Sequence, residues 1–316
     1  MAKLRDYNMN GTIILGVDAG YGNYKTARCC FRTSVSRSDQ PPIFTRNFLE
    51  YEGNYYTIGE GHKDFVAEKS MDDDNYIFTL AAIAKELNAR GLYSAKIHLA
   101  VGLPLKWVQT QRDSFREYMM QNRYVDYKYA GRHYVVDIVD CTVMPQCYAA
   151  VAESLSDFKG MHMVVDIGNG TINVMILNNG KASESRSWTV KMGANECFMA
   201  IRNLILDRKA EELPAEIIEN YLRHGSADIG DEYRTLMEEA AKSYVDKIFA
   251  ELKAHGYNSN LMKLYVMGGG AKIVELVGSY DSGNVTFNHD IRVNAKGYEY
   301  FCYMKLRRQK AMASAG

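Results

Sequence analysis

Apolar runs and amphipathic stretches alternate along this chain, which predicts alternating strands and helices. Strands, marked by β-branched, apolar or alternating runs, are expected at residues 12–17, 97–101, 134–143, 162–165 and 264–267. Helices, marked by apolar residues at helical spacing, are expected at 76–92, 113–120, 193–206, 231–252 and 298–309. A further helix is expected to begin just after Pro145. This alternation is typical of an α/β protein.

Two segments share one pattern, in which a buried-type strand ends in Asp and is followed by x-Gly-x-Gly. The first is Asp18-Ala-Gly-Tyr-Gly22, and the second is Asp166-Ile-Gly-Asn-Gly170. β-forming residues resume after each, at 24–31 and 172–177. Each segment therefore predicts a β-hairpin with a glycine-bent tip. Two copies about half the chain apart favour two homologous domains over a solenoid repeat.

Such a bend can direct several backbone N–H groups toward one point, because glycine tolerates positive φ and leaves the approach open. That arrangement suits phosphate oxygens, and Lys25 follows the first bend closely. An Asp beside a polyphosphate needs a cation, so Asp18 and Asp166 suggest Mg²⁺ held partly through water. The alternative is that each glycine pair only makes a tight turn. The repetition, with a third glycine cluster at 268–270, favours phosphate binding.

Composition narrows the function classes. A chain of 316 residues with 47% apolar residues can form two domains or one domain with a deep cleft. Its 38 Lys and Arg balance 38 Asp and Glu, which argues against a broad basic face for nucleic acid. The six cysteines are scattered without a C-x-x-C pair, so reduced thiols are expected rather than a zinc site.

The sequence carries neither a recognisable targeting signal nor one of the common nucleotide-binding fingerprints. No apolar run approaches the ~18 residues that span a bilayer, and no secretory leader is visible, so a cytoplasmic protein without membrane contact is expected. Neither a P-loop nor a dinucleotide fingerprint occurs. The acidic run at 72–74 is expected to be a solvated loop rather than a metal site.

Together these segments resemble the actin-type ATPase superfamily of actins, chaperone ATPase domains and sugar kinases. The superfamily has five motifs, and segments that resemble all five occur here in the same order. The first phosphate loop corresponds to 18–25, the first connecting helix to 144–146 and the second phosphate loop to 166–171. The adenosine motif corresponds to 266–271 and the second connecting region to 293–297. Within it, the segments that resemble the ParM-like plasmid-segregation actins are 101–105, 143–146 and 294–298.

The resemblance implies an actin-like fold, in which two ribonuclease-H-like domains flank a nucleotide cleft. Domain I would cover residues 12–158 with the C-terminal helix 294–310, and domain II would cover 159–293. The phosphates would be held by Gly20, Tyr21, Gly22, Asn23 and Lys25 from domain I and by Gly168, Asn169, Gly170 and Thr171 from domain II. Gly268, Gly269 and Gly270 would pack against the adenosine.

The resemblance also implies three catalytic residues. Asp18 and Asp166 would organise hydrated Mg²⁺, and Gln146 would position the attacking water. Some family members carry Glu where this chain has Gln146, and Gln cannot act as a full general base. The side chains that contact the nucleotide's base are expected in the region 190–225, where the candidates are Lys191, Glu219 and Arg223.

The expected function is that of an ATPase, with GTP as a possible substrate, that polymerises into filaments with itself. It would segregate plasmid DNA through a small DNA-binding adaptor at a centromere-like site. The alternative is a small-molecule kinase of the sugar or acetate type, for which the sequence identifies no separate acidic base. A non-catalytic nucleotide-dependent scaffold is a third class. The basic residues Lys305, Arg307, Arg308 and Lys310 are attributed to a helix end, which favours cations, rather than to direct DNA contact.

Overall fold

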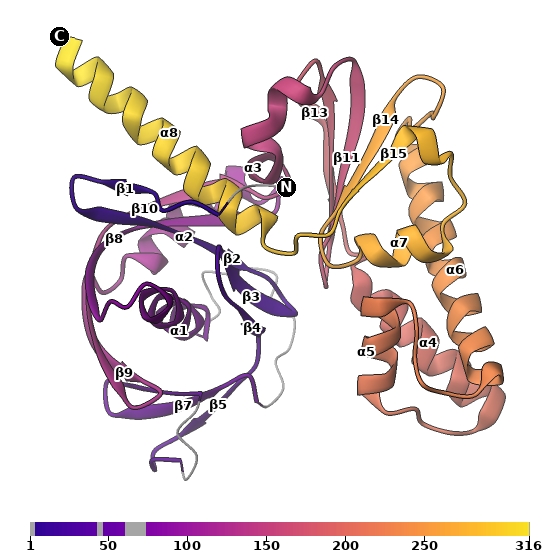
Figure 1. Cartoon of the computed structure of the whole chain (residues 1–316), viewed down its shortest axis with the longest axis horizontal. Coiled ribbons are helices and arrows are strands. Elements are labelled where there is room, and N and C mark those ends of the chain that lie inside the picture. Colours follow the sequence, from indigo (N-terminus) through magenta and orange to yellow (C-terminus); the bar gives the residue numbers. More distant parts are fainter. Residues whose placement is uncertain (1–3, 43–46, 61–73, 316) are drawn as a thin grey trace. The chain divides into compact units, whose positions relative to one another are not determined.

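The computed structural model describes residues 4–42, 47–60 and 74–315. The chain divides into two compact units (Figure 1). Unit 1 comprises Met1–Glu153 and Arg292–Gly316, and unit 2 comprises Ser154–Ile291. Within the described ranges, no helix combines the length and the apolar character that crossing a membrane requires.

Unit 1 is built on a large sheet that encloses one helix. Its strands are β1 (Asn8–Met9), β2 (Thr12–Ala19), β3 (Asn23–Thr26), β4 (Cys30–Arg32), β5 (Val35–Ser38), β6 (Phe48–Tyr51), β7 (Asn54–Ile58), β8 (Ser94–Leu103), β9 (Tyr124–Tyr129) and β10 (Arg132–Pro145). Its helices are α1 (Asp74–Ala89), α2 (Val108–Met119), α3 (Tyr148–Val151) and α8 (Val293–Ala315), and a 3₁₀ segment at Ala152–Asp157 leads into unit 2.

The sheet of unit 1 has the order β4-β3-β2-β8-β10-β9-β6-β7-β5, with β1 paired to β2. Figure 1 shows it curling around α1, which is buried on almost every side. A helix that packs on all faces needs apolar residues all round. The sequence of α1 meets this need, because its central part is Tyr-Ile-Phe-Thr-Leu-Ala-Ala-Ile-Ala, with few polar positions. On the other face of the sheet, α8 packs against β2 and β8 around Ile14, Ala100 and Tyr298.

Unit 2 has a smaller sheet, and most of its helices lie between the third and fourth strands in the sequence. Its strands are β11 (Met161–Ile167), β12 (Ile172–Asn178), β13 (Lys181–Val190), β14 (Lys263–Met267) and β15 (Val285–Asn288). Its helices are α4 (Ala194–Lys209), α5 (Ala215–His224), α6 (Asp231–Ala254) and α7 (Ala271–Val277), with a 3₁₀ turn at Ser282–Asn284. The stripe Met237, Ala241, Tyr244, Val245 and Ile248 of α6 joins the core that also holds Val165 and Val266.

The two units repeat one strand order. In unit 1 the path β4-β3-β2-β8-β10 has an antiparallel hairpin on one side and parallel strands on the other. In unit 2 the path β13-β12-β11-β14-β15 repeats this with the same senses. The two predicted Asp-Gly hairpins are confirmed as β2–β3 and β11–β12. The α/β class and the pair of ribonuclease-H-like domains are confirmed as well.

Some elements differ from the sequence-based predictions. The helix expected after Pro145 is the single turn α3, because Cys147 takes a positive φ of 68° and delays the helix start. The strands β5–β7, β9, β13 and β15 and the helix α5 were not predicted. Of the acidic run 72–74, Asp74 begins α1, whereas 72 and 73 lie outside the described residues. All six cysteines are free thiols.

Candidate functional site

The first bend carries a buried carboxylate that two other elements reach. Asp18 stands near the end of β2 and is only 2% exposed. The hairpin register places Lys25 of β3 opposite it, and Lys25 Nζ lies 2.9 Å from Asp18 Oδ2. Gln146, directly after β10, donates from Nε2 to Asp18 Oδ1 at 3.1 Å. Three of the predicted site residues of unit 1 therefore meet at one carboxyl group.

The chain between Asp18 and Lys25 is held by Thr33. Thr33 Oγ1 donates to the carbonyl of Gly20 at 2.7 Å, and Thr33 N donates to the carbonyl of Gly22 at 3.1 Å. A Cβ at Gly20 would lie 2.6 Å from the carbonyl oxygen of Asn23, so the bend closes this tightly only with glycine at that position. Tyr21, Gly22 and Asn23 are all partly exposed at the tip, where a ligand can approach them.

Gln146 is positioned by backbone contacts on both sides. Its N–H donates to the carbonyl of Leu103 at 2.8 Å, and its own carbonyl accepts from Tyr148 N at 2.7 Å. The next residue, Cys147, donates from its N–H to Asn294 Oδ1 at 3.1 Å. Asn294 lies in the first turn of α8, so the two predicted connecting regions meet within unit 1.

The second bend has the same plan with a different support. Asp166 of β11 is 5% exposed and stands opposite Asn173 of β12. Gly168 N donates to the carbonyl of Thr171 at 2.9 Å, which closes the bend. The carbonyl of Asn169 accepts from Asn195 N at 3.0 Å, at the start of α4. The first turn of α4 thus holds the bend, and its helix N-terminus adds a positive partial charge there.

The contact between this bend and α4 depends on Gly193. A Cβ at Gly193 would lie 2.2 Å from the carbonyl oxygen of Asn169. Gly193 was predicted only as the first residue of a helix, and its role beside the bend was missed. Sequence alone does not show that the glycine at the start of this helix packs against the glycine-rich bend, because the two meet only in the folded chain.

The third glycine cluster lies beside Asp166. In the parallel pair β11–β14, Asp166 stands opposite Met267, so Gly268 follows directly beside it. Gly268 has a φ of 87°, and a Cβ there would lie 2.5 Å from Asp166 Oδ1. Gly270 N donates to the carbonyl of Ile167 at 3.0 Å. Gly269, by contrast, is exposed and a Cβ there would contact nothing within 4 Å.

The structure therefore forms one group of predicted residues in each unit. Unit 1 joins the 20–23 bend, Asp18, Lys25 and Gln146, and unit 2 joins the 168–171 bend, Asp166 and the 268–270 cluster. Of the guessed base contacts, Lys191 follows β13, and Glu219 and Arg223 pair with each other on α5 at 3.1 Å. Thr33 and Asn294 were not predicted as supports, because a threonine and an asparagine carry no distinctive sequence signal.

The chemistry of both groups suits an anion with a bound cation. Each has a glycine bend that is at least partly exposed, and each has one buried carboxylate. Among the described residues, no three His, Cys, Asp or Glu side chains cluster as a direct metal site. Mg²⁺ in nucleotide sites is typically held by one or two carboxylates, by water and by the phosphates themselves.

Two family models match the chain. The N-terminal domain of the actin-like proteins matches residues 16–148, and the C-terminal domain of the archaeal actin homologue MreB-like proteins matches residues 164–277. The first match spans Asp18 and Gln146, and the second spans Asp166 and the 268–270 cluster. The sequence matches none of the curated proteins.

Solved structures of actin-like proteins share the fold. A 15-stranded ParM filament from Clostridium botulinum superposes with a TM-score of 0.74 at 16% identity, covering 92% of this chain and 99% of that chain. The actin-like protein Alp7A gives 0.73 at 14% identity, covering 96% and 98%. The archaeal actin homologue Ta0583, solved with ADP, gives 0.71 at 17% identity, covering 92% and 98%. The fold, the strand order and the two family matches, which together run from residue 16 to residue 277 with a short gap, identify this chain as an actin-like protein.

Proposed function

We propose that this actin-like protein is an ATPase whose filaments assemble and disassemble with the state of one bound nucleotide. The observation that carries the proposal is the repetition of one feature: a buried Asp at a strand end beside a glycine bend, once in each unit. A protein that bound phosphate with one domain would need only one such feature.

In this proposal each unit contributes part of the phosphate site. The 20–23 bend and Lys25 would hold the β-phosphate, and residues 168–171 would hold the β- and γ-phosphates. Lys25 now neutralises Asp18 at 2.9 Å, and an arriving phosphate would share its ammonium group. The exposed Gly269 would lie against the adenosine, where its lack of a side chain permits close approach.

The residues also fit Mg²⁺. Asp18 and Asp166 are buried carboxylates beside the two bends, and both supply the oxygen donors that Mg²⁺ prefers. When bound with nucleotide, Mg²⁺ would neutralise charge on the phosphates. Gln146 would orient a water through its amide, since its position is fixed by Leu103 and Asp18.

Assembly follows from the same site. If each unit grips part of one triphosphate, hydrolysis removes a group that holds them together and changes the surface offered to a neighbour. The filament structures of ParM support assembly with further copies of this chain. We extend the proposal to plasmid segregation through a DNA-binding adaptor, because the chain as a whole, with a formal net charge of +0, has no excess of cations with which to bind DNA directly.

Sedimentation and electron microscopy of the purified protein with Mg²⁺ and ATP, GTP or ADP test the proposal. We expect sedimenting filaments with a triphosphate, phosphate release, and disassembly after turnover. A protein that stays monomeric at high concentration with every nucleotide contradicts the filament proposal. Robust ATP-dependent phosphorylation of a sugar or of acetate would instead indicate a small-molecule kinase.

A further inference from the structure

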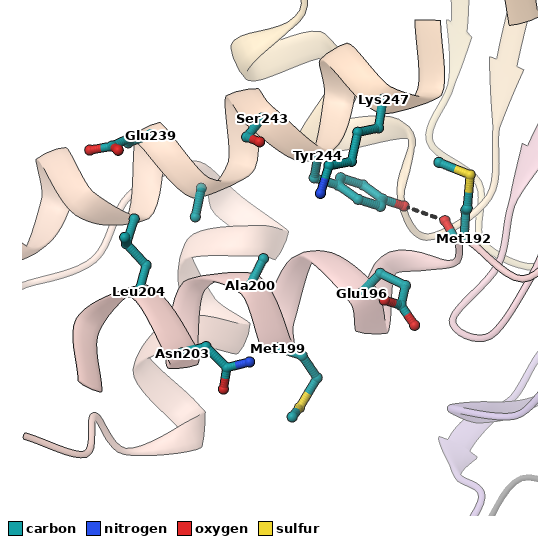
Figure 2. Close-up of a pocket in the computed structure, with 11 residues that line it drawn as sticks. Met192, Glu196, Met199, Ala200, Asn203, Leu204, Glu239, Ser243, Tyr244 and Lys247 are labelled. Carbon is teal, nitrogen blue, oxygen red and sulfur yellow. Dashed lines mark hydrogen bonds between the residues drawn. The ribbon is translucent and has the colours of Figure 1, made fainter. Parts of the chain in front are cut away.

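A groove of 440 Å³ lies between α4 and α6 of unit 2 and begins at the first turn of α4, next to the residues that hold the second bend. Figure 2 shows Met199, Ala200 and Leu204 of α4 along one wall and Tyr244 of α6 on the other. Tyr244 is fixed there because its hydroxyl donates to the carbonyl of Met192 at 2.8 Å. The groove therefore presents apolar surface between two helices, as helix-binding grooves do.

Charged side chains edge this groove. Glu196 on α4 and Glu239 on α6 are both exposed, and neither forms an ion pair with any described residue. Lys247, two turns further along α6, also lines the groove. Two unpaired acids and one cation beside an apolar wall predict a ligand that is apolar on one face and mainly basic at its edges.

The end of α8 has that character. This helix is buried as far as Cys302, and beyond it Lys305, Arg307 and Arg308 are exposed. Met312 near the helix end is 76% exposed, a large apolar side chain without cover. In Figure 1 this yellow segment extends beyond the sheet of unit 1. Within the described ranges these cations form no ion pair, although Arg307 stacks on Tyr303.

Helical spacing places three of these side chains on one face. Lys305, Arg308 and Met312 are three and four residues apart, so they project from the same side of α8, whereas Arg307 projects from another. A helix C-terminus also carries a partial negative charge, which Lys247 of the groove could meet.

The charge of the two units matches this pairing. Of the 38 Lys and Arg, 14 lie in unit 2 and 24 in unit 1, whereas the 38 Asp and Glu divide as 19 and 19. Unit 2 therefore has a net charge of −5 and unit 1 of +5, although the whole chain is neutral. Unit 1 of one copy and unit 2 of another attract each other at long range.

We infer that the α8 end of one copy docks into the α4–α6 groove of a second copy, with Met312 on the apolar wall and Lys305 and Arg308 near Glu196 and Glu239. The inference rests on the proposed function, because it names a contact of the filament. The two surfaces differ, so each copy binds one neighbour through its groove and another through its helix. A contact of this kind produces an open polymer or a ring.

Charge reversal on either side tests the docking. Lys305→Glu with Arg308→Glu makes the helix acidic, and Glu196→Lys with Glu239→Lys makes the groove basic. Each variant alone should need at least about tenfold more protein to assemble, because it sets like charges against each other. An equimolar mixture of the two should recover assembly, since each helix then meets an oppositely charged groove. The far-UV circular dichroism spectrum and the unfolding temperature, which should be nearly unchanged, show that both variants are folded.

Matched controls lie next to the reversed residues. Arg307→Glu changes the same helix away from the proposed face, and Glu238→Lys changes α6 beside Glu239 but outside the groove. Both should assemble within about twofold of the wild type, as surface changes outside a contact do. If these controls weaken assembly as much as the paired reversals, or if the mixture fails to recover, the docking is wrong.

The outcomes also separate the docking from the filament proposal. Normal filaments from both reversed variants would refute the docking alone. Wild-type oligomers that never form sedimenting polymer, and that the reversals abolish, would support the docking and refute the filament proposal. A wild-type protein that stays monomeric in mass photometry with and without nucleotide would refute both.

Discussion

Gln146 presents a neutral amide to Asp18, and its Nε2 donates to Asp18 Oδ1 at 3.1 Å. An amide in this position can orient a water molecule by hydrogen bonding, but it does not take a proton from that water as a carboxylate would. Gln146→Ala should lower the rate of ATP hydrolysis about a hundredfold, as loss of one positioned group does, and leave nucleotide affinity nearly unchanged. Phosphate release and nucleotide titration measure the two effects. The exposed Gln121→Ala is the control, and equal hydrolysis by both variants would remove Gln146 from the mechanism.

Glu299 is a second residue with an unusual environment. It is 1% exposed on α8, and its Oε1 accepts from Gly16 N at 3.1 Å. Burial raises its pKa to about 8, assisted by Glu86, while the Gly16 N–H, Arg90 and Arg28 act in the opposite direction. The folded state therefore holds a proton on Glu299 at pH values where the unfolded chain has lost it.

This shift predicts how stability depends on pH. Because the folded pKa lies above the usual value of 4.5, the contribution of Glu299 is complete below that value and is lost as pH rises toward about 8. Glu299→Gln keeps an acceptor for Gly16 and removes the titration. Urea unfolding at about pH 6 and about pH 8 should show the wild type losing ~1–3 kcal/mol more than the variant. An equal loss in both proteins would mean that Glu299 is ionised in the fold.

At the scale of elements, adjacent glycines in one turn have different roles. Gly268 adopts a φ of 87° and leaves no room for a Cβ beside Asp166, whereas Gly269 has open space. Gly268→Ala should therefore lower the free energy of unfolding by ~2 kcal/mol or more, because both the backbone and the packing are strained. Gly269→Gln should leave stability within ~1 kcal/mol and weaken nucleotide binding. Denaturant unfolding and nucleotide titration check both, and unchanged binding in the Gly269 variant would place the adenosine elsewhere.

The packing of α8 on α3 gives another element-scale prediction. A Cβ at Gly297 of α8 would lie 2.0 Å from the carbonyl oxygen of Ala149 in α3. Gly297→Val should separate these helices, destabilise unit 1 by ~2–3 kcal/mol and disturb Gln146 through Cys147 and Asn294. Thermal unfolding and hydrolysis rates measure this. Wild-type values for both would show that the two connecting regions are not coupled.

Some elements could be predicted from sequence because their pattern is local. The two hairpins follow from an apolar run that ends in Asp and two glycines, and α6 follows from its regular stripe. The supports of the site could not be predicted in this way. Thr33 contacts Gly20 across β4, and Asn294 contacts Cys147 across 147 residues, so only the folded chain brings them together.

At the scale of the molecule, the repeated strand order could be anticipated from the repeated Asp-Gly segments, whereas the full extent of the unit 1 sheet could not. Strand β9 (YVDYKY) alternates between exposed and buried positions, and β5 (VSRS) and β7 (NYYTI) are short and largely polar, so none of the three has the continuous apolar run that marks a buried strand. Strand β6 (FLEY) is only four residues long. The opposite charges of the units also remain hidden in the net charge of +0.

The charge division leads to a prediction for the whole molecule. Attraction between unit 1 of one copy and unit 2 of another weakens when salt shortens the range of electrostatic forces. Raising NaCl from about 50 to about 300 mM should therefore increase the protein concentration needed for assembly several-fold. Light scattering at saturating nucleotide measures this threshold. A threshold that falls with salt would indicate a mainly apolar contact instead.

The central claim is that the two acid-and-glycine bends bind the same nucleotide. Calorimetric titration of Mg²⁺–nucleotide into the full chain tests it most directly, with Asp18→Ala, Asp166→Ala and the exposed control Asp228→Ala alongside. We expect one nucleotide per chain, an affinity at least about tenfold weaker in each of the first two variants, and no change in the control. Two independent sites per chain, or wild-type affinity in either Asp18→Ala or Asp166→Ala, would contradict the account.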